Sequence, residues 1–240
     1  MIAAVPQGEA RPRYLPAVAA VFVTSLVIAN IIAAKLFAVG SVVLPAAVVI
    51  FPVSYIVGDI LTEVYGYARA RQVIWIGFAC NLLAVAAIEI SIRLAPVPFW
   101  NLGALGSAEL SQQAYAAVFG TTPRLLAASF AAYLFGEFLN AFVLAKMKIA
   151  TEGRHLWMRT IGSTLVGQLA DSLIFITLAF WGAVPPAALG MMIVSQWLAK
   201  SAYEVVATPL TYLVVFRLKR TENEDFYDVG TRFNPLLWRR

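Results

Sequence analysis

The chain has 240 residues, of which 61% are hydrophobic and 13% are charged, and its mean hydropathy is +0.78. A soluble domain carries about 25% charged and about 45–50% apolar residues, so this composition excludes a water-soluble fold and makes lipid the expected solvent. The net charge of +5 would indicate nucleic-acid binding in a soluble protein, but here the basic residues lie between apolar runs, which is typical of membrane topology. The single cysteine, Cys80, excludes an internal disulfide and a cysteine metal cluster.

The apolar runs predict an all-α integral membrane protein. The first run, from Tyr14 to Phe37, is longer than the apolar region of a signal peptide, which is about 7–15 residues, so we interpret it as an uncleaved spanning helix. A spanning helix needs about 20 mostly apolar residues. Six segments satisfy this within a single transmembrane domain over residues 1–220, namely 14–37, 42–64, 70–94, 124–146, 160–182 and 187–217.

Two stretches outside these segments have different characters. Within 95–122, the helical spacing of Leu110, Tyr115 and Phe119 predicts a short interfacial helix, with a surface turn as the alternative. Residues 221–240 are charged and are expected to form a partly disordered cytoplasmic tail.

Lysine and arginine residues are distributed unevenly between the loops. Fourteen fall on one side of the predicted helices, whereas only Arg93 and Arg124 fall on the other. The positive-inside rule therefore predicts that both termini are cytoplasmic and that the number of spans is even.

A faint internal repeat is compatible with a 3+3 inverted architecture, as in many transporters. Ser54–Asp59 (SYIVGD) is similar to Ser163–Gln168 (STLVGQ), and both Asn30 and Asn140 precede an Ala-Lys pair.

Polar residues recur at helical spacing inside the apolar segments. Residues four apart share a helix face, and a polar face in a spanning helix usually faces protein or a water-filled cavity. The candidate positions are Asn30 in the first helix; Tyr55, Asp59 and Glu63 in the second; Tyr133, Glu137 and Asn140 in the fourth; Gln168 and Asp171 in the fifth; and Gln196, Lys200, Tyr203 and Glu204 in the sixth.

The cost of exposing these charges to lipid decides how they are arranged. Each central Asp or Lys costs about 2.5–3.5 kcal/mol on insertion scales, so four such residues would cost roughly 10 kcal/mol. They must line a common cavity, pair with one another or be neutralised by protonation. One alternative is a purely structural network, with Lys200 paired to Asp171 or Glu204 and the amides joining helices.

One lysine cannot neutralise all the carboxylates, and the surplus predicts a site for a cation, a proton or a ligand rich in hydrogen-bond donors. Carboxylate and amide oxygens together suit a guanine-like edge, which presents two donors beside an acceptor. The tyrosines Tyr55, Tyr133 and Tyr203 could stack on a flat ring or simply pack.

Several enzyme and ATPase signatures are absent from the sequence. There is no Walker A loop, and the single histidine, His155, lies in a basic loop without an HExxH motif. Asp59 and Asp171 would permit an intramembrane aspartyl protease, but Ile-Val-Gly precedes Asp59 instead of the Gly-x-Gly signature of those proteases. We expect no enzyme activity, cofactor or metal.

Four segments carry a resemblance to a known family: NIIAAKLF (30–37), FPVSYIVGDILTEVYGYARAR (51–71), GQLADSLIF (167–175) and SQWLAKSAYEVVATP (195–209). They resemble the queuosine precursor transporter family, also called the vitamin uptake transporter family, over about residues 14–217. The resemblance implies a six-helix protein of the bacterial inner membrane that imports 7-deazaguanines such as preQ0 and preQ1 without its own ATPase. The alternative is a substrate-binding subunit of an energy-coupling-factor transporter. Six helices are few for a whole transport path, which would favour a homodimer.

The resemblance also suggests roles for the polar residues. Asp171, Gln168 and Glu204 would hydrogen-bond the base. The remaining binding residues would be Glu137, Asn140, Gln196, Asn30, Tyr133, Tyr203 and Lys200, with Lys200 keeping the carboxylates ionised. A cytoplasmic gate would comprise Tyr55, Asp59, Glu63, Arg69 and Arg71. The aminomethyl cation of preQ1 would suit the negative pocket.

Overall fold

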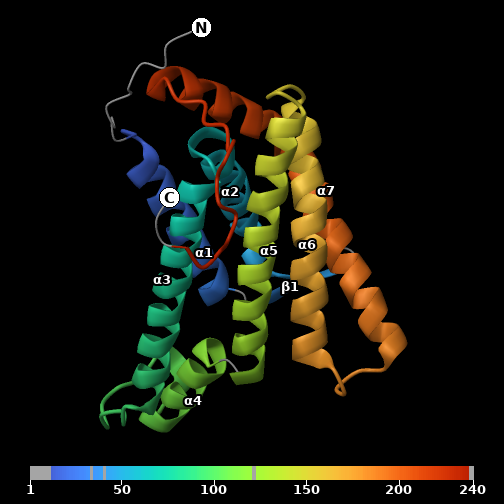
Figure 1. The fold of residues 1–240 in the computed structure, drawn as a ribbon. Coiled ribbons are helices and arrows are strands. Elements are labelled where there is room, and N and C mark those ends of the chain that lie inside the picture. Colours follow the sequence, from blue (N-terminus) through green and yellow to red (C-terminus); the bar gives the residue numbers. More distant parts are fainter. Residues whose placement is uncertain (1–11, 33–34, 40–41, 121–122, 238–240) are drawn as a thin grey trace, which may run out of the picture.

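The computed structural model describes residues 12–237 except 33–34, 40–41 and 121–122 (Figure 1). Helices form almost all of the described fold: α1 (Leu15–Ile32), α2 (Phe51–Tyr65), α3 (Tyr67–Arg93), α4 (Ala108–Phe119), α5 (Pro123–Ala150), α6 (Leu156–Phe180) and α7 (Pro186–Glu222). A small antiparallel hairpin of β1 (Leu36–Val39) and β2 (Val42–Pro45) lies between α1 and α2, and η1 (Ala46–Val49) and η2 (Gly103–Leu105) are short 3-10 turns.

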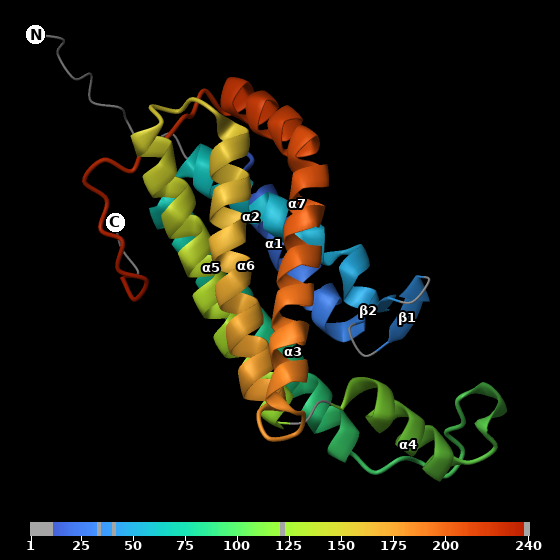
Figure 2. The same cartoon turned by 90° about the vertical axis from the view of Figure 1, so that its right-hand side faces the viewer.

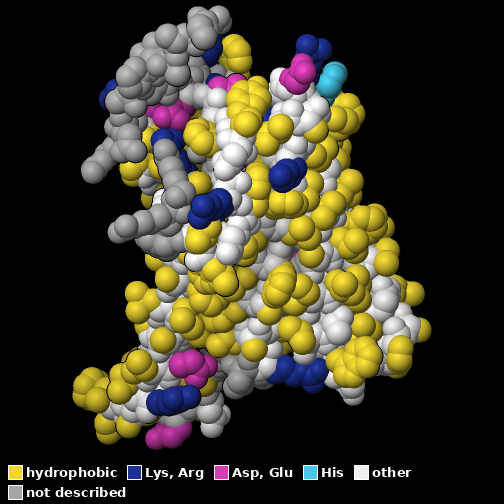
Figure 3. Space-filling view, in the orientation of Figure 1, with side chains coloured by type: hydrophobic (Ala, Val, Ile, Leu, Met, Phe, Trp, Pro, Cys, Tyr) yellow, Lys and Arg dark blue, Asp and Glu magenta, His cyan; other side chains and the backbone are white. Residues whose placement is uncertain are grey.

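Four stretches of the described helices are long and apolar enough to cross a membrane: α1, α3, the stretch Ala108–Ala150 that includes α4 and α5, and α6. In the space-filling view, hydrophobic side chains form a broad band, with charged side chains gathered towards the two ends (Figure 3). This distribution is the one that a bilayer requires of a spanning protein.

The boundaries of the first two predicted helices were wrong. The first helix ends at Ile32 rather than at residue 37, and residues 42–49 form β2 and η1, so that the second helix begins only at Phe51. Residues 42–49 are apolar throughout, and such a run does not distinguish a strand from a helix by length and hydropathy alone. Pro52 fixes the start of α2, because proline is accommodated in the first helical turn, where its missing N–H is not needed.

The other predicted helices agree with the structure to within a few residues. The expected helices 70–94, 124–146, 160–182 and 187–217 correspond to α3, α5, α6 and α7. The short helix expected within 95–122 is α4, and its interfacial location stays a prediction.

Helix α2 is the centre of the bundle. It has only 15 residues, about 22 Å of helix, and nearly every side chain from Ser54 to Tyr65 is buried. Helices α1, α3, α5 and α7 contact it. Polar groups on α2 therefore face protein from every side.

Helices α5 and α6 lie side by side in both ribbon views (Figures 1 and 2). Two glycines allow this close approach: a Cβ atom on Gly136 would lie 2.9 Å from Cβ of Asp171, and one on Gly167 would lie 2.7 Å from Cβ of Asn140. The backbones of α5 and α6 are therefore in close contact beside two candidate binding residues, Asn140 and Asp171.

The C-terminal part of the chain is folded back onto the bundle. Helix α7 contains Pro209 and turns across one end of the bundle (Figure 2), where Glu222 accepts hydrogen bonds from the main-chain N–H groups of Arg13 and Tyr14 at 2.9 and 2.6 Å. The following residues run between α3 and α5 (Figure 1). The expectation of a partly disordered tail is thus wrong for residues 223–237, because helix side chains bind their carbonyl and carboxylate oxygens.

Candidate functional site

A buried polar cluster lies between α2, α5, α6 and α7. Asp59 is 0% exposed, and its Oδ1 accepts a hydrogen bond from Nδ2 of Asn140 at 2.8 Å. Lys200 on α7 forms an ion pair with Asp171 on α6. The cluster comprises Asp59 from α2, Glu137 and Asn140 from α5, Gln168 and Asp171 from α6, and Glu204 and Lys200 from α7.

Several oxygens of this cluster have no protein hydrogen-bond partner among the described residues, although they are fully enclosed. They are Asp59 Oδ2, Asn140 Oδ1, Gln168 Oε1 and Glu204 Oε1. A buried polar atom without a partner costs about 1–3 kcal/mol. All four atoms are acceptors, so the cluster is suited to a ligand that presents several donors.

Charge is also unbalanced in the cluster. Lys200 is the only cation that the described part of the cluster contains, and it pairs with Asp171. None of the described ion pairs within 4 Å includes Asp59, Glu137 or Glu204, although Glu137 lies within electrostatic range of Lys200. Burying an unpaired carboxylate costs several kcal/mol, so a positively charged group or protons would stabilise this region.

Two tyrosines lie in or beside the cluster. The hydroxyl of Tyr55 on α2 makes a hydrogen bond with Gln168 and lies within electrostatic range of the carboxylates of Asp171 and Glu137. The hydroxyl of Tyr133 on α5 donates to the carbonyl of Ile74 at 3.0 Å and so ties α5 to α3. Tyr55 thus belongs to the cluster, whereas Tyr133 is anchored beside it.

Three of the predicted binding residues lie elsewhere. Tyr203 is 43% exposed, so it faces away from the bundle. Asn30 donates to Oδ1 of Asn81 at 3.3 Å and thereby joins α1 to α3. Gln196 is half-buried two turns from Glu204, towards the start of α7.

A second polar group surrounds Glu63, one helical turn beyond Asp59 on α2. Nε and Nη2 of Arg159 donate to its two carboxylate oxygens, both at 2.7 Å, and Nζ of Lys219 donates to Oε1 at 2.6 Å. Nζ of Lys148 donates to the carbonyl of Glu63 and to Asp225, both at 2.5 Å. We call Glu63, Lys148, Arg159, Lys219 and Asp225 the Glu63 network; it joins α2, α5, α6, α7 and the C-terminal segment.

Three of the five predicted gate residues lie in these two groups, and the other two bind the C-terminal segment. Glu63 is the centre of its network, whereas Asp59 and Tyr55 lie in the polar cluster. Arg69 pairs with Glu224 at 2.8 Å, and Nη1 of Arg71 donates to the carbonyls of Arg232 and Asn234, both at 2.9 Å.

The sequence did not indicate the partners of Glu63. The positive-inside count treats Lys148, Arg159 and Lys219 as loop charges, although Lys148 and Arg159 are each only 1% exposed. Arg159 precedes Ser163 by four residues and thus extends the polar face of α6, which was the one available signal.

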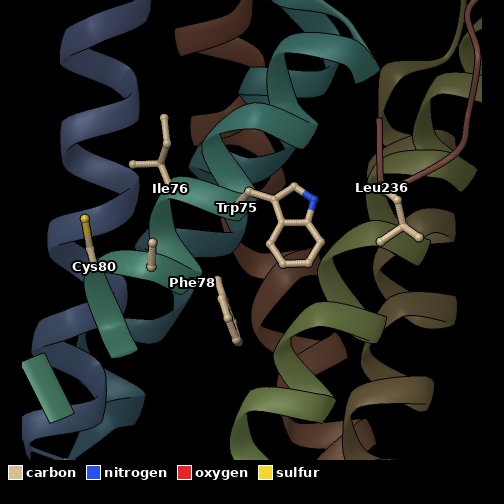
Figure 4. Close-up of a pocket in the computed structure, with 6 residues that line it drawn as sticks. Trp75, Ile76, Phe78, Cys80 and Leu236 are labelled. Atoms are coloured by element: carbon tan, nitrogen blue, oxygen red, sulfur yellow. The ribbon is translucent and has the colours of Figure 1, made fainter. Parts of the chain in front are cut away.

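A shallow apolar depression on the outer side of α3 is separate from both groups. Figure 4 shows the indole ring of Trp75 between α3 and Leu236, with Phe78, Ile76 and Cys80 on neighbouring turns of α3. Aliphatic and aromatic side chains, together with Cys80, line this depression. It therefore provides no charged group for a polar ligand.

Residues 45–214 match the family described as "Putative vitamin uptake transporter". The chain is 32% identical over 155 residues to the "Probable queuosine precursor transporter" of Bacillus subtilis (strain 168), over 64% of each chain. It is 28% identical over 132 residues to the "Queuosine precursor transporter" of Escherichia coli (strain K12), over 55% of this chain and 52% of that one. A Haemophilus influenzae protein, named "Probable queuosine precursor transporter", is 25% identical over 136 residues, over 57% of this chain and 52% of that one.

No solved structure matches this fold. The matched region spans between 52% and 64% of the length of these curated relatives. The family match covers well over half of the chain, and the family is one of transporters rather than enzymes. The chain is therefore a multi-pass membrane protein that belongs to the vitamin uptake transporter family.

Proposed function

We propose that the protein imports a queuosine precursor, a 7-deazaguanine such as preQ0 or preQ1, or queuine, across the bacterial inner membrane. The names of the relatives support this substrate class. The observation that carries the proposal is the buried polar cluster with its unpartnered acceptors Asp59 Oδ2, Asn140 Oδ1, Gln168 Oε1 and Glu204 Oε1.

The chemistry of the base fits these acceptors. A guanine-like edge donates through its ring N–H and exocyclic amine and accepts through its ring carbonyl. Carboxylates such as Glu204 suit the two donors, and the amide of Gln168 or Asn140 can supply a donor to the carbonyl. The aminomethyl cation of preQ1 would also compensate the charge of the unpaired carboxylates. Its hydrogen bonds to them would be charge-assisted, and such bonds are stronger than those between neutral groups.

The proposed orientation follows the positive-inside rule. Lys148, Arg159 and Lys219 lie at the end of the bundle that carries Glu63. At the other end, Arg124 binds the carbonyls of Leu178 and Trp181. We propose six spans with the Glu63 end and both termini cytoplasmic. The inverted repeat and the homodimer stay predictions.

Uptake by the purified protein tests the proposal. Protein in liposomes should accumulate radiolabelled preQ1 without ATP, and Asp171→Ala or Glu204→Ala should abolish uptake while Glu89→Gln, far from the cluster, should not. Normal uptake by both site variants would refute the site. Uptake that requires an added ATPase module would instead favour the substrate-binding subunit of an energy-coupling-factor transporter.

A further inference from the structure

The C-terminal segment binds the corner between α2 and α3. The N–H of Phe226 donates to the carbonyl of Val64 at 3.2 Å, and both carboxylate oxygens of Asp228 accept from the N–H of Tyr67, at 3.1 and 3.0 Å. A helix end leaves N–H and C=O groups without partners inside the helix, and this segment supplies partners to both helices. Gly66 forms the corner with φ of +83°, and any Cβ there would strike the ring of Phe226.

Beyond this corner the segment is attached along α3 and α5. Arg71 holds two of its carbonyls, and Nε1 of Trp75 donates to the carbonyl of Pro235 at 2.7 Å. The ring of Phe233 packs against Tyr67 and Phe142, with centroid distances of 5.0 and 5.2 Å. Residues 223–237 therefore follow a defined course over the bundle.

The segment also shares two cations with Glu63. Oδ1 of Asp225 accepts from Lys148 at 2.5 Å and from Lys219 at 2.8 Å, and the same two lysines contact Glu63. Lys148 donates in addition to the carbonyl of Phe226 at 2.8 Å. The position of the segment and the ion pairs of Glu63 are thus coupled.

The Glu63 network lies next to the polar cluster, on the side that faces the Glu63 end of the bundle. Glu63 is four residues from Asp59, about 6 Å along α2. Its cations come from α5, α6 and α7, the same helices that supply the rest of the cluster. A ligand that leaves the cluster towards this end must separate Glu63 from at least one of them.

We infer that residues 223–236 form a strap that closes the Glu63 end of the transport path, and that release of Asp225 from Lys148 and Lys219 opens it. This inference rests on the proposed transport function. The side chain of Asp225 is 44% exposed whereas that of Glu63 is 0% exposed. Water can therefore take over the bonds of the Asp225 carboxylate, while Lys148 keeps the carbonyl of Glu63 as an acceptor and the bidentate contact between Glu63 and Arg159 stays intact.

Thiol labelling tests the strap without any substrate. Cys80→Ser removes the native cysteine, and Ser163→Cys places a probe on α6 at a position that is 0% exposed, between Arg159 and Gln168. In inside-out vesicles, a membrane-impermeant thiol reagent should label this probe slowly. Asp225→Asn or Asp228→Asn should accelerate labelling by roughly tenfold or more, the size expected when a charge-assisted hydrogen bond is lost. The control Glu89→Gln should leave the rate unchanged.

An unchanged labelling rate in both strap variants would overturn the inference. A second measurement needs no variant: in the wild-type protein, amides of residues 223–236 should exchange with solvent roughly tenfold or more faster than those of 156–170. Exchange of both segments at one common rate would make the segment a fixed part of the bundle and also overturn the inference. Strap-dependent labelling without preQ1 uptake would instead refute only the proposed substrate.

Discussion

Replacing Glu63 by Gln should be among the most destabilising single changes in the bundle. Glu63 is 0% exposed, and its carboxylate accepts two hydrogen bonds from Arg159 at 2.7 Å and one from Lys219 at 2.6 Å. The glutamine amide would carry no negative charge, and its NH2 group would face the N–H donors of Arg159 or Lys219. Removing one partner from a buried ion pair costs about 3–5 kcal/mol, because the remaining charge is left uncompensated.

Reversible unfolding by sodium dodecyl sulfate in mixed micelles measures this cost. A loss of about 3–5 kcal/mol corresponds to a fall of roughly 10²- to 10⁴-fold in the folding equilibrium constant. Glu89→Gln is the matched control, because Glu89 and Arg93 form a partly exposed i,i+4 pair at 3.5 Å, and such a pair contributes only about 0.3–0.5 kcal/mol. A Glu63→Gln variant as stable as Glu89→Gln would refute the reasoning about the Glu63 network.

Three further predictions concern packing, the ion pair and pH. Gly167→Ala should reduce stability by about 1–3 kcal/mol and impair uptake, because its Cβ would lie 2.7 Å from Cβ of Asn140. Gly190→Ala is the control: Gly190 has open space around it, so the substitution should change neither stability nor uptake in the same assays. Lys200→Met should destabilise the protein, because it leaves the charge of Asp171 without its partner. The double variant Lys200→Met with Asp171→Leu should recover stability but not uptake. Recovery of both stability and uptake would make the ion pair purely structural. Burial raises the pKa of the Asp225 carboxyl, but hydrogen bonds from Lys148 and Lys219 outweigh burial, so that its pKa lies below the ordinary value of 3.8. A carboxyl with a lowered pKa contributes stability above its ordinary pKa and loses it as pH falls through the folded-state pKa. Pulsed hydrogen exchange of residues 223–236 should therefore show constant protection from pH 8 to 5 and a loss below about pH 4; a loss already between pH 7 and 5 would contradict this assignment.

The sequence predicted helix faces well and helix partners poorly. Spacing alone identified Asp171 and Lys200 as inward-facing, and the structure joins them in an ion pair. Spacing could not predict the hydrogen bond between Asp59 and Asn140, because this contact depends on where α2 crosses α5. The spacing of polar and apolar residues within each helix does not specify that crossing point. The sequence therefore places Asp59 at the gate and not in the cluster.

The same limit explains the unforeseen parts of the fold. Charge counting treats Lys148 and Lys219 as loop residues, yet their long side chains reach back to a buried carboxylate. The course of residues 223–237 was also unforeseen, because a charged composition predicts solvation, and here helix ends and lysines bind the charges. The hairpin of β1 and β2 was missed because a short apolar run fits either strand or helix.

Rescue of tRNA queuosine tests the central claim most directly, namely that the buried acceptor cluster binds the imported base. The host would be a cell that can neither make nor import precursors, supplied separately with preQ0, preQ1 or queuine. Wild-type protein should restore queuosine in tRNA with at least one of these compounds, and Glu204→Gln should not, at equal amounts in the membrane. Equal rescue by wild type and Glu204→Gln would contradict the account, as would a failure of the wild-type protein with all three compounds.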